Sequence, residues 1–257
     1  NKLEDWMNGN KLVINPDKTH LMVMGSKKDA AKRKRVYMMA GGFTIKPTES
    51  EKLLGCHCQL HQSLDWKFHV QDHKGSLLNQ LNSRLNGLKK VCVNANFSTK
   101  LMVANGAVMS KLTYLITLWG GAQGYILDAV QVQQLAAARA VCGFKCWRWS
   151  KRKLLGKLGW LSVRQLVVYH TVLQAHKTLK TGMPKPLYQT LSGGYPRRTR
   201  SAAIGQIRQD NRFTNQSTFK YRAMKNFNSV PVNVRVGSTA TVKRKLKEWI
   251  KTNIPID

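Results

Sequence analysis

The sequence is short of acidic residues. Only 12 Asp and Glu stand against 43 Lys and Arg in 257 residues, which gives a formal net charge of +31. The imbalance is uneven, because residues 1–138 carry 18 basic and 9 acidic residues whereas residues 139–257 carry 25 and 3. A polynucleotide polymerase or nuclease needs clustered carboxylates to share divalent metals, and this sequence has no Asp-Asp pair. We therefore expect no nucleotidyl transfer by this chain alone.

Long apolar runs and a disulfide framework are also missing. No run approaches the ~20 apolar residues of a membrane span, and no signal peptide opens the chain, so we expect no membrane partner. Five cysteines, an odd number in irregular positions, favour a reducing compartment. Two groups have partial zinc-ligand character: Cys56-His57-Cys58 with His61, and His69 with His73. Neither repeats a zinc spacing, and buried thiols beside surface histidines are the alternative, so we expect no metal and no cofactor.

Cations and aromatic residues are abundant instead. So large an excess of positive charge indicates a polyanionic partner, and nucleic acid is the usual one. An anionic membrane surface and an unstructured basic tail are the alternatives. A tail would lack core residues, yet the basic half of the chain keeps many aromatic side chains: Trp147, Trp149, Trp160, Phe219, Phe227 and Trp249. We therefore expect a folded protein whose partner is RNA or DNA.

The period of the apolar residues changes near Trp66. Upstream, short bursts flank the Gly41-Gly42 dipeptide, a good hairpin turn, and residues 52–60 predict one further strand. Within it, Gly55 indicates a bulge or a close approach by another backbone or a ligand. Downstream, apolar residues recur at helical spacing. The predicted fold is α+β and mostly α, with a small N-terminal β region at 1–64, a helical bundle at 65–145, and a basic helical region at 146–257 that contains a long loop at 192–218.

Six helices are predicted in the second and third regions. One carries the stripe from Val70 to Leu88, a second follows Ser98 as N-cap, and a third spans about 126–141 with Gln131, Gln133 and Gln134 on its polar side. Ser162 opens a capping box for a helix that reaches about Lys180. The last helices lie at 219–227 and 242–250.

The candidate binding surface consists of basic clusters interleaved with aromatic residues. Lysines and arginines supply the salt-dependent attraction to phosphates, and aromatic rings can stack on bases. A merely solvated basic face is the alternative. From charge and position, the predicted nucleic-acid contacts are Lys89, Lys90, Lys151, Arg152, Lys153, Trp160, Arg197, Arg198 and Arg200.

Short motifs follow one another along almost the whole chain. They include Asn10 to Thr19, Leu53-Leu54-Gly55, and Leu64-x-Trp66-x-x-His69. The series continues through residues 114–120, 131–139, 159–161, 199–201, 219–231 and 243–249. In this order the motifs resemble the C-terminal portion of reverse transcriptases from non-LTR retrotransposons. Leu53-Leu54-Gly55 is similar to the primer-grip turn of that family, although Leu53 replaces the usual aromatic residue.

The resemblance implies more about function than the composition alone does. It adds Leu54 and Gly55 to the predicted nucleic-acid contacts and makes the bundle similar to a thumb that holds template and primer. The palm aspartates of the family would lie upstream of Asn1 or are absent. We therefore expect a non-catalytic nucleic-acid-binding fragment or derivative of such an enzyme. The alternatives are the C-terminal piece of an active RNA-directed DNA polymerase and a structural protein of a ribonucleoprotein. The expected location is intracellular, in the nucleus or with ribonucleoprotein.

Overall fold

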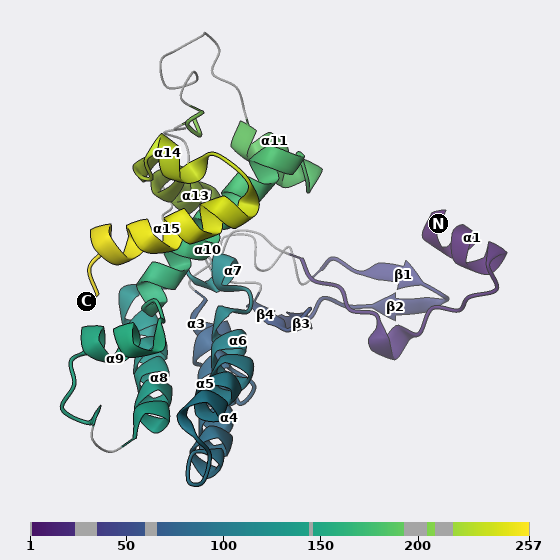
Figure 1. Cartoon of the computed structure of the whole chain (residues 1–257). Helices are drawn as coiled ribbons and strands as arrows, with labels where there is room; N and C mark the ends of the chain where they lie inside the picture. The colour runs from purple at the N-terminus through teal and green to yellow at the C-terminus, as the bar shows by residue number, and fades with distance from the viewer. Residues whose placement is uncertain are drawn as a thin grey trace. The chain divides into compact units, whose positions relative to one another are not determined.

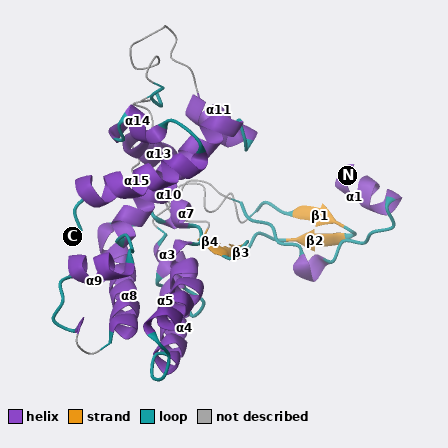
Figure 2. Ribbon diagram, in the orientation of Figure 1, coloured by secondary structure: helices purple, strands orange, loops and turns teal. Residues whose placement is uncertain are grey.

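The computed structural model describes residues 2–23, 35–59, 66–143, 146–192, 205–208 and 218–256. Helices dominate, with two small two-stranded sheets, so the fold is α+β and mostly α, as predicted. Figure 2 shows this balance of helix and strand. The chain divides into two compact units, Asn1–Ser63 and Leu64–Asp257, here called the hairpin unit and the helical unit.

Two antiparallel hairpins characterise the first unit. Strands β1 (Met38–Ala40) and β2 (Phe43–Ile45) are joined by Gly41 and Gly42, whose φ angles of 60° and 80° suit a tight hairpin turn, so this predicted hairpin is confirmed. The same unit contains helix α1 (Lys2–Gly9) and the 3-10 turn η1 (Pro16–Lys18).

The second hairpin corrects the prediction of a single strand at 52–60. The chain instead forms β3 (Ser50–Leu53) and β4 (Cys56–Gln59), which pair antiparallel with Leu53 opposite Cys56. Leu54 and Gly55 have φ angles of 48° and 80°. Two consecutive residues in the left-handed region reverse the chain, so Gly55 belongs to a turn and not to a bulge.

The first half of the helical unit is a bundle of broken helices. Its elements are α3 (Lys67–Val70), α4 (Leu77–Val91), α5 (Phe97–Val103), the π-helical segment η3 (Ala104–Met109), α6 (Ser110–Thr113), α7 (Ile116–Trp119) and α8 (Gly124–Cys142). The apolar stripe predicted from Val70 to Leu88 is buried. Asn96, and not Ser98, caps α5, because its Oδ1 accepts from Thr99 N at 2.9 Å.

The second half of the unit is arranged around one long helix. Its elements are α9 (Lys151–Leu158), α10 (Val163–Thr181), α11 (Lys185–Ser192), α13 (Phe219–Ser229), α14 (Val232–Arg235) and α15 (Thr239–Asn253). The predicted capping box at Ser162 and Gln165 is present, and Gly182 ends α10. Figure 1 shows α10 passing between α7 and α8 on one side and α13 and α15 on the other.

One hydrophobic core runs through the helical unit. Its buried members extend from Val70 in α3 to Ile250 in α15, without a break at residue 145. Helix α10 contributes to the packing against both groups of helices, since it contacts α7 and α8 as well as α13 and α15. The helical regions predicted at 65–145 and 146–257 therefore share a core.

Two glutamines on α8 correct a further prediction. Gln131 and Gln134 lie inside the unit, with exposed fractions of 9% and 0%. Gln134 Nε2 donates to Leu161 O at 2.8 Å, and its Oε1 accepts from Gln131 Nε2 at 2.8 Å. Gln131 Oε1 in turn accepts from Val163 N at 2.8 Å. These bonds fasten the connection between α9 and α10 onto α8, which is why two polar residues occupy a buried face.

Candidate nucleic-acid interface

One end of the helical unit gathers cations from four segments of the chain. Lys89 and Lys90 lie in the last turn of α4, and Arg139 lies in the last turn of α8. Lys100 comes from α5, and α9 contributes its basic first turn. Cations at helix C-termini also stabilise the helix dipole, by about 0.3–1 kcal/mol each. We call this region the basic end and define it by Lys89, Lys90, Lys100, Arg139, Trp147, Trp149, Lys151, Arg152, Lys153 and Lys157.

A groove of about 690 Å³ opens at the basic end. Its wall is built from the ends of α4 and α8, from α5, and from Trp147 in the segment that follows α8. Lys89, Lys100 and Arg139 place positive charge around it. The complete lining is Lys89, Cys92, Val93, Lys100, Ala136, Arg139, Ala140, Gly143 and Trp147.

Aromatic rings lie beside the cations of the basic end. The guanidinium carbon of Arg139 is 5.8 Å from the ring centre of Trp147, and Trp147 itself is 65% exposed. Lys153 Nζ lies 4.7 Å from the ring centre of Trp149, and Lys157 Nζ lies 5.9 Å from that of Phe97. Such cation–π contacts hold long side chains in place at an exposed surface. The basic end therefore presents positioned cations and an open indole ring together.

Acidic side chains lie elsewhere on the described part of the helical unit. There, the acidic residues are Asp72, Asp128 and Glu248, and each is paired with a basic side chain: with Lys67 at 3.3 Å, with Arg164 at 2.9 Å and with Arg244 at 4.0 Å. None of the three lines the groove. The positive potential of the basic end is therefore not neutralised by a carboxylate in the groove.

Only some of the predicted contact residues lie at the basic end. Lys89, Lys90, Lys151, Arg152 and Lys153 are exposed at the basic end. The remaining members of the prediction lie in the other unit, in the core or outside the described residues: Leu54, Gly55, Trp160, Arg197, Arg198 and Arg200.

Leu54 and Gly55 form the tip of the β3–β4 hairpin, where Leu54 is 80% exposed. They belong to the hairpin unit, whereas the basic end belongs to the helical unit. Arg197, Arg198 and Arg200 fall outside the described residues, as does most of the loop predicted at 192–218.

Trp160 is a correction to the predicted surface. Its side chain is only 8% exposed, and its Nε1 donates to Asn105 Oδ1 at 2.9 Å. The indole fills space between α9 and the π-helical segment and cannot stack on a base. The basic first turn of α9 suggested an exposed aromatic after it, but Gly159 turns the chain inward with a φ of 67°.

Three charged or aromatic residues of the groove are absent from the predicted contacts: Lys100, Arg139 and Trp147. Lys100 is isolated in the sequence, and Arg139 stands at the end of an apolar helix, so neither belongs to a basic cluster. Trp147 was read as a core aromatic. Its neighbour Arg148 and the following cluster at 151–153 were the available sign that this stretch is a surface.

Two arginines are structural and do not contribute to the interface. Arg222 is 8% exposed, and its Nη2 donates to the carbonyl oxygens of Thr117 at 2.6 Å and Leu118 at 3.2 Å, at the end of α7. Burial lowers the pKa of Arg222 to about 10. Arg235 is 4% exposed and donates from Nη1 to Gly205 O at 3.2 Å. Net charge alone therefore overstates the number of cations available to a partner.

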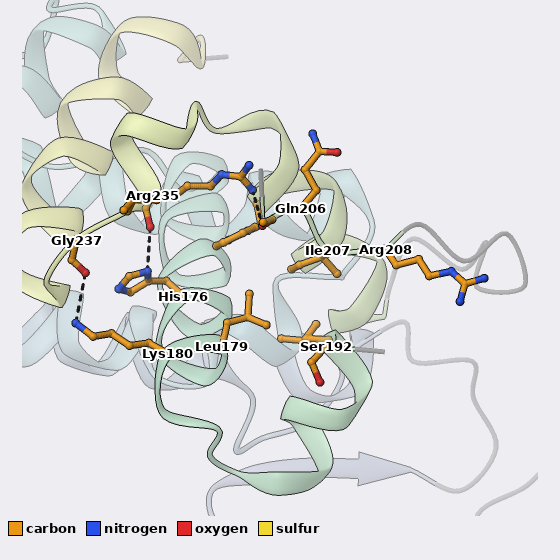
Figure 3. A pocket seen from close by; sticks show the side chains of 13 residues that line it. His176, Leu179, Lys180, Ser192, Gln206, Ile207, Arg208, Arg235 and Gly237 are labelled. Carbon is orange, nitrogen blue, oxygen red and sulfur yellow. Dashed lines mark hydrogen bonds between the residues drawn. The ribbon is translucent and has the colours of Figure 1, made fainter. Parts of the chain in front are cut away.

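A second cavity, of about 480 Å³, lies between α10, α11 and α14 (Figure 3). The segment Gly205–Arg208 forms part of its wall. Ile207 is held by Asn228, whose Oδ1 accepts from Ile207 N at 2.9 Å and whose Nδ2 donates to Ile207 O at 2.8 Å. On the opposite wall, His176 Nδ1 lies 3.1 Å from Arg235 O, and Lys180 Nζ donates to Gly237 O at 3.4 Å. The cavity marks where a short extended segment docks on the helices.

The two histidines of α10, His176 buried and His170 partly buried, predict acid sensitivity. Burial is the main cause that lowers the pKa of His176 and of His170. Nearby lysines lower both further, whereas the hydrogen bond between His176 and Arg235 O opposes part of the shift of His176. Below a pH of about 6.5 the unfolded chain binds protons at these positions that the folded chain does not. Stability should therefore be constant just above pH 7 and fall as the pH decreases through 6.5. Urea unfolding at pH 7.5 and 5.5 measures this difference, and the double variant His170→Asn/His176→Gln should reduce it. An unchanged difference would contradict the assignment.

The described part of the chain has no cluster of metal ligands and no membrane-spanning helix. No group of three or more His, Cys, Asp or Glu side chains there is arranged to hold a metal ion. Cys56 and Cys58 Sγ lie 4.0 Å apart, and burial raises the pKa of Cys56 to about 12; His61 is outside the described residues. Within those same ranges, each helix is too short or too polar to cross a bilayer.

Comparison with known proteins adds no relative. No family model, curated protein or solved structure matches this chain.

Proposed function

We propose that this chain binds nucleic acid and grips phosphate groups with the basic end of its helical unit. The observation that carries the proposal is the groove where Lys89, Lys100 and Arg139 meet beside Trp147. These residues come from three helices and the segment after the third, so the fold, and not a local run of basic sequence, assembles them. Cations without a carboxylate among them attract a polyanion and release its counterions on binding.

The proposal also concerns the kind of protein from which the chain derives. The ordered motifs from Asn10 to Trp249, which resemble the post-palm region of non-LTR reverse transcriptases, support a derivative or fragment of such an enzyme that binds and does not catalyse. A hairpin with Leu54-Gly55 at its tip, followed in the chain by a helical bundle, is compatible with the primer-grip and thumb roles that the resemblance implies. RNA, DNA or their hybrid is accordingly the proposed partner, and a ribonucleoprotein is its proposed setting.

The test is the salt dependence of binding. Fluorescence anisotropy with a labelled 20-base-pair duplex should show affinity falling roughly 10³- to 10⁵-fold between 50 and 200 mM salt, as expected for about 6–10 phosphate contacts. The triple variant Lys89→Gln/Lys100→Gln/Arg139→Gln should reduce the slope of log affinity against log salt by up to about 2.7, because each contact contributes about 0.9.

A matched control removes the same charge elsewhere. Lys177, Lys185 and Lys225 are exposed on α10, α11 and α13, and none lines the groove. Changing these three to Gln should leave the slope nearly unchanged. Equal losses in both triple variants would show that binding is spread over the whole surface, and a flat salt response of the unmodified protein would refute nucleic-acid binding itself.

A further inference from the structure

The floor of the groove at the basic end is unlike a surface built only for phosphates. Ala136 and Ala140 lie one turn apart on α8, and Cys92 and Gly143 complete an apolar surface of small residues. A Cβ placed on Gly143 would meet nothing within 4 Å, so the backbone there faces open space. Phosphate groups need cations and gain nothing from such a floor. The floor indicates an occupant with a flat apolar part.

The residues around this apolar floor are charged or aromatic. Lys89, Lys100 and Arg139 stand around the floor, and Trp147 forms an exposed aromatic wall beside Arg139. The occupant must therefore carry negative charge next to its apolar part. A volume of about 690 Å³ is in the range of about 300–1,000 Å³ that small organic groups occupy in proteins. A nucleotide unit, with a planar base and flanking phosphates, has this combination.

Base pairing decides which form of nucleic acid fits. In a duplex both faces of an internal base are covered by stacked neighbours, and exposing one costs unstacking and unpairing energy. An unpaired base has free faces that can stack on an aromatic side chain. Resting on the proposed nucleic-acid binding, we propose that the groove receives an unpaired nucleobase of a single strand, which lies over Ala136 and Ala140 against Trp147 while the phosphates on either side contact Lys89, Lys100 and Arg139.

The experiment compares strands of equal length and charge that differ in their bases or in their sugars. Anisotropy titrations at one salt concentration use a 12-nucleotide thymidine strand, the corresponding uridine RNA strand, and a 12-unit abasic strand with the same sugar–phosphate charge. The unmodified protein should bind the base-containing strands roughly 5- to 150-fold more tightly than the abasic one, the range that loss of one base–aromatic stack gives. The thymidine and uridine arms distinguish a DNA from an RNA strand as the preferred source of the base.

Trp147→Ala should remove most of that preference and weaken abasic-strand binding much less, because Lys89, Lys100 and Arg139 are all retained. Trp147 is exposed, so the change should not unfold the chain. The control is Tyr125→Ala, which removes another exposed aromatic ring at the opposite end of α8 and should keep the preference.

The two proposals fail in different ways. If the abasic strand binds as tightly as the others, the groove takes no base and phosphate binding alone remains. If Trp147→Ala keeps the preference for bases, the base lies elsewhere and the inference is overturned. If none of the strands binds and the duplex does not bind either, the proposed function fails and the base site fails with it.

Discussion

Alanine in place of Gly120 is expected to destabilise the helical unit by about 3 kcal/mol, the upper end of the usual cost of overpacking. Gly120 follows α7 where that helix crosses α10. An added Cβ would press against the carbonyl oxygen of Ile116 and lie 2.8 Å from Cγ2 of Val167. The backbone oxygen cannot rotate away, and Val167 is buried in α10, so the two helices would have to separate.

Chemical denaturation followed by circular dichroism measures this loss. The matched control is Gly87→Ala, an exposed position inside α4 where a Cβ would meet nothing within 4 Å. That change should be neutral or stabilise the unit by up to about 1 kcal/mol, because alanine is the better helix former. Equal stabilities for the two variants would show that α7 and α10 are not in the close contact described.

Leucine in place of Gln134 is the second large change. Leucine has a similar size but makes no hydrogen bonds, so Leu161 O and Gln131 Nε2 would lose their partner in the core. Each buried polar group left unpaired costs about 1–3 kcal/mol, and we expect a loss of about 2–5 kcal/mol in the free energy of unfolding.

Its control is the neighbouring position on the same helix. Gln133 is only partly buried, and Gln133→Leu should change stability by less than about 0.5 kcal/mol. The same denaturation experiment serves for both variants. If Gln134→Leu were as stable as the unmodified protein, the bonds to Leu161 and Gln131 would contribute nothing to the fold.

The helical stripes and the first hairpin could be predicted because their signals are local. Leucines at helical spacing from Leu77 to Leu88 indicate the buried face of a helix. Two glycines between short apolar bursts indicate a hairpin turn. The buried glutamines could not be predicted, because a periodicity argument treats every glutamine as a surface residue. Whether Gln134 faces water or Leu161 depends on the α9–α10 connection, which lies 27 positions further along the chain.

The same difference between local signals and long-range contacts explains which parts of the candidate site could be predicted. Lys151, Arg152 and Lys153 are adjacent in sequence, and their exposure at one surface follows from the capped start of α9. The groove brings Lys89 of α4 together with Arg139 of α8, and no sequence pattern pairs positions so far apart. Trp147 and Trp160 show the limit most directly, since both stand near the same basic cluster and only packing makes one exposed and the other buried.

The π-helical segment η3 sets the phase of the helix in which it lies. A π turn bonds residue i to i+5 and so holds one residue more than the α turn it replaces. Deleting one residue between Ala104 and Met109 would return this turn to α geometry, and because the wider turn had absorbed the extra residue, Leu112 of α6 would stay in the core. The segment thus has the form of a one-residue insertion in an α-helix. It joins α5, whose side chains are exposed or only partly buried, to α6, where Leu112 is fully buried.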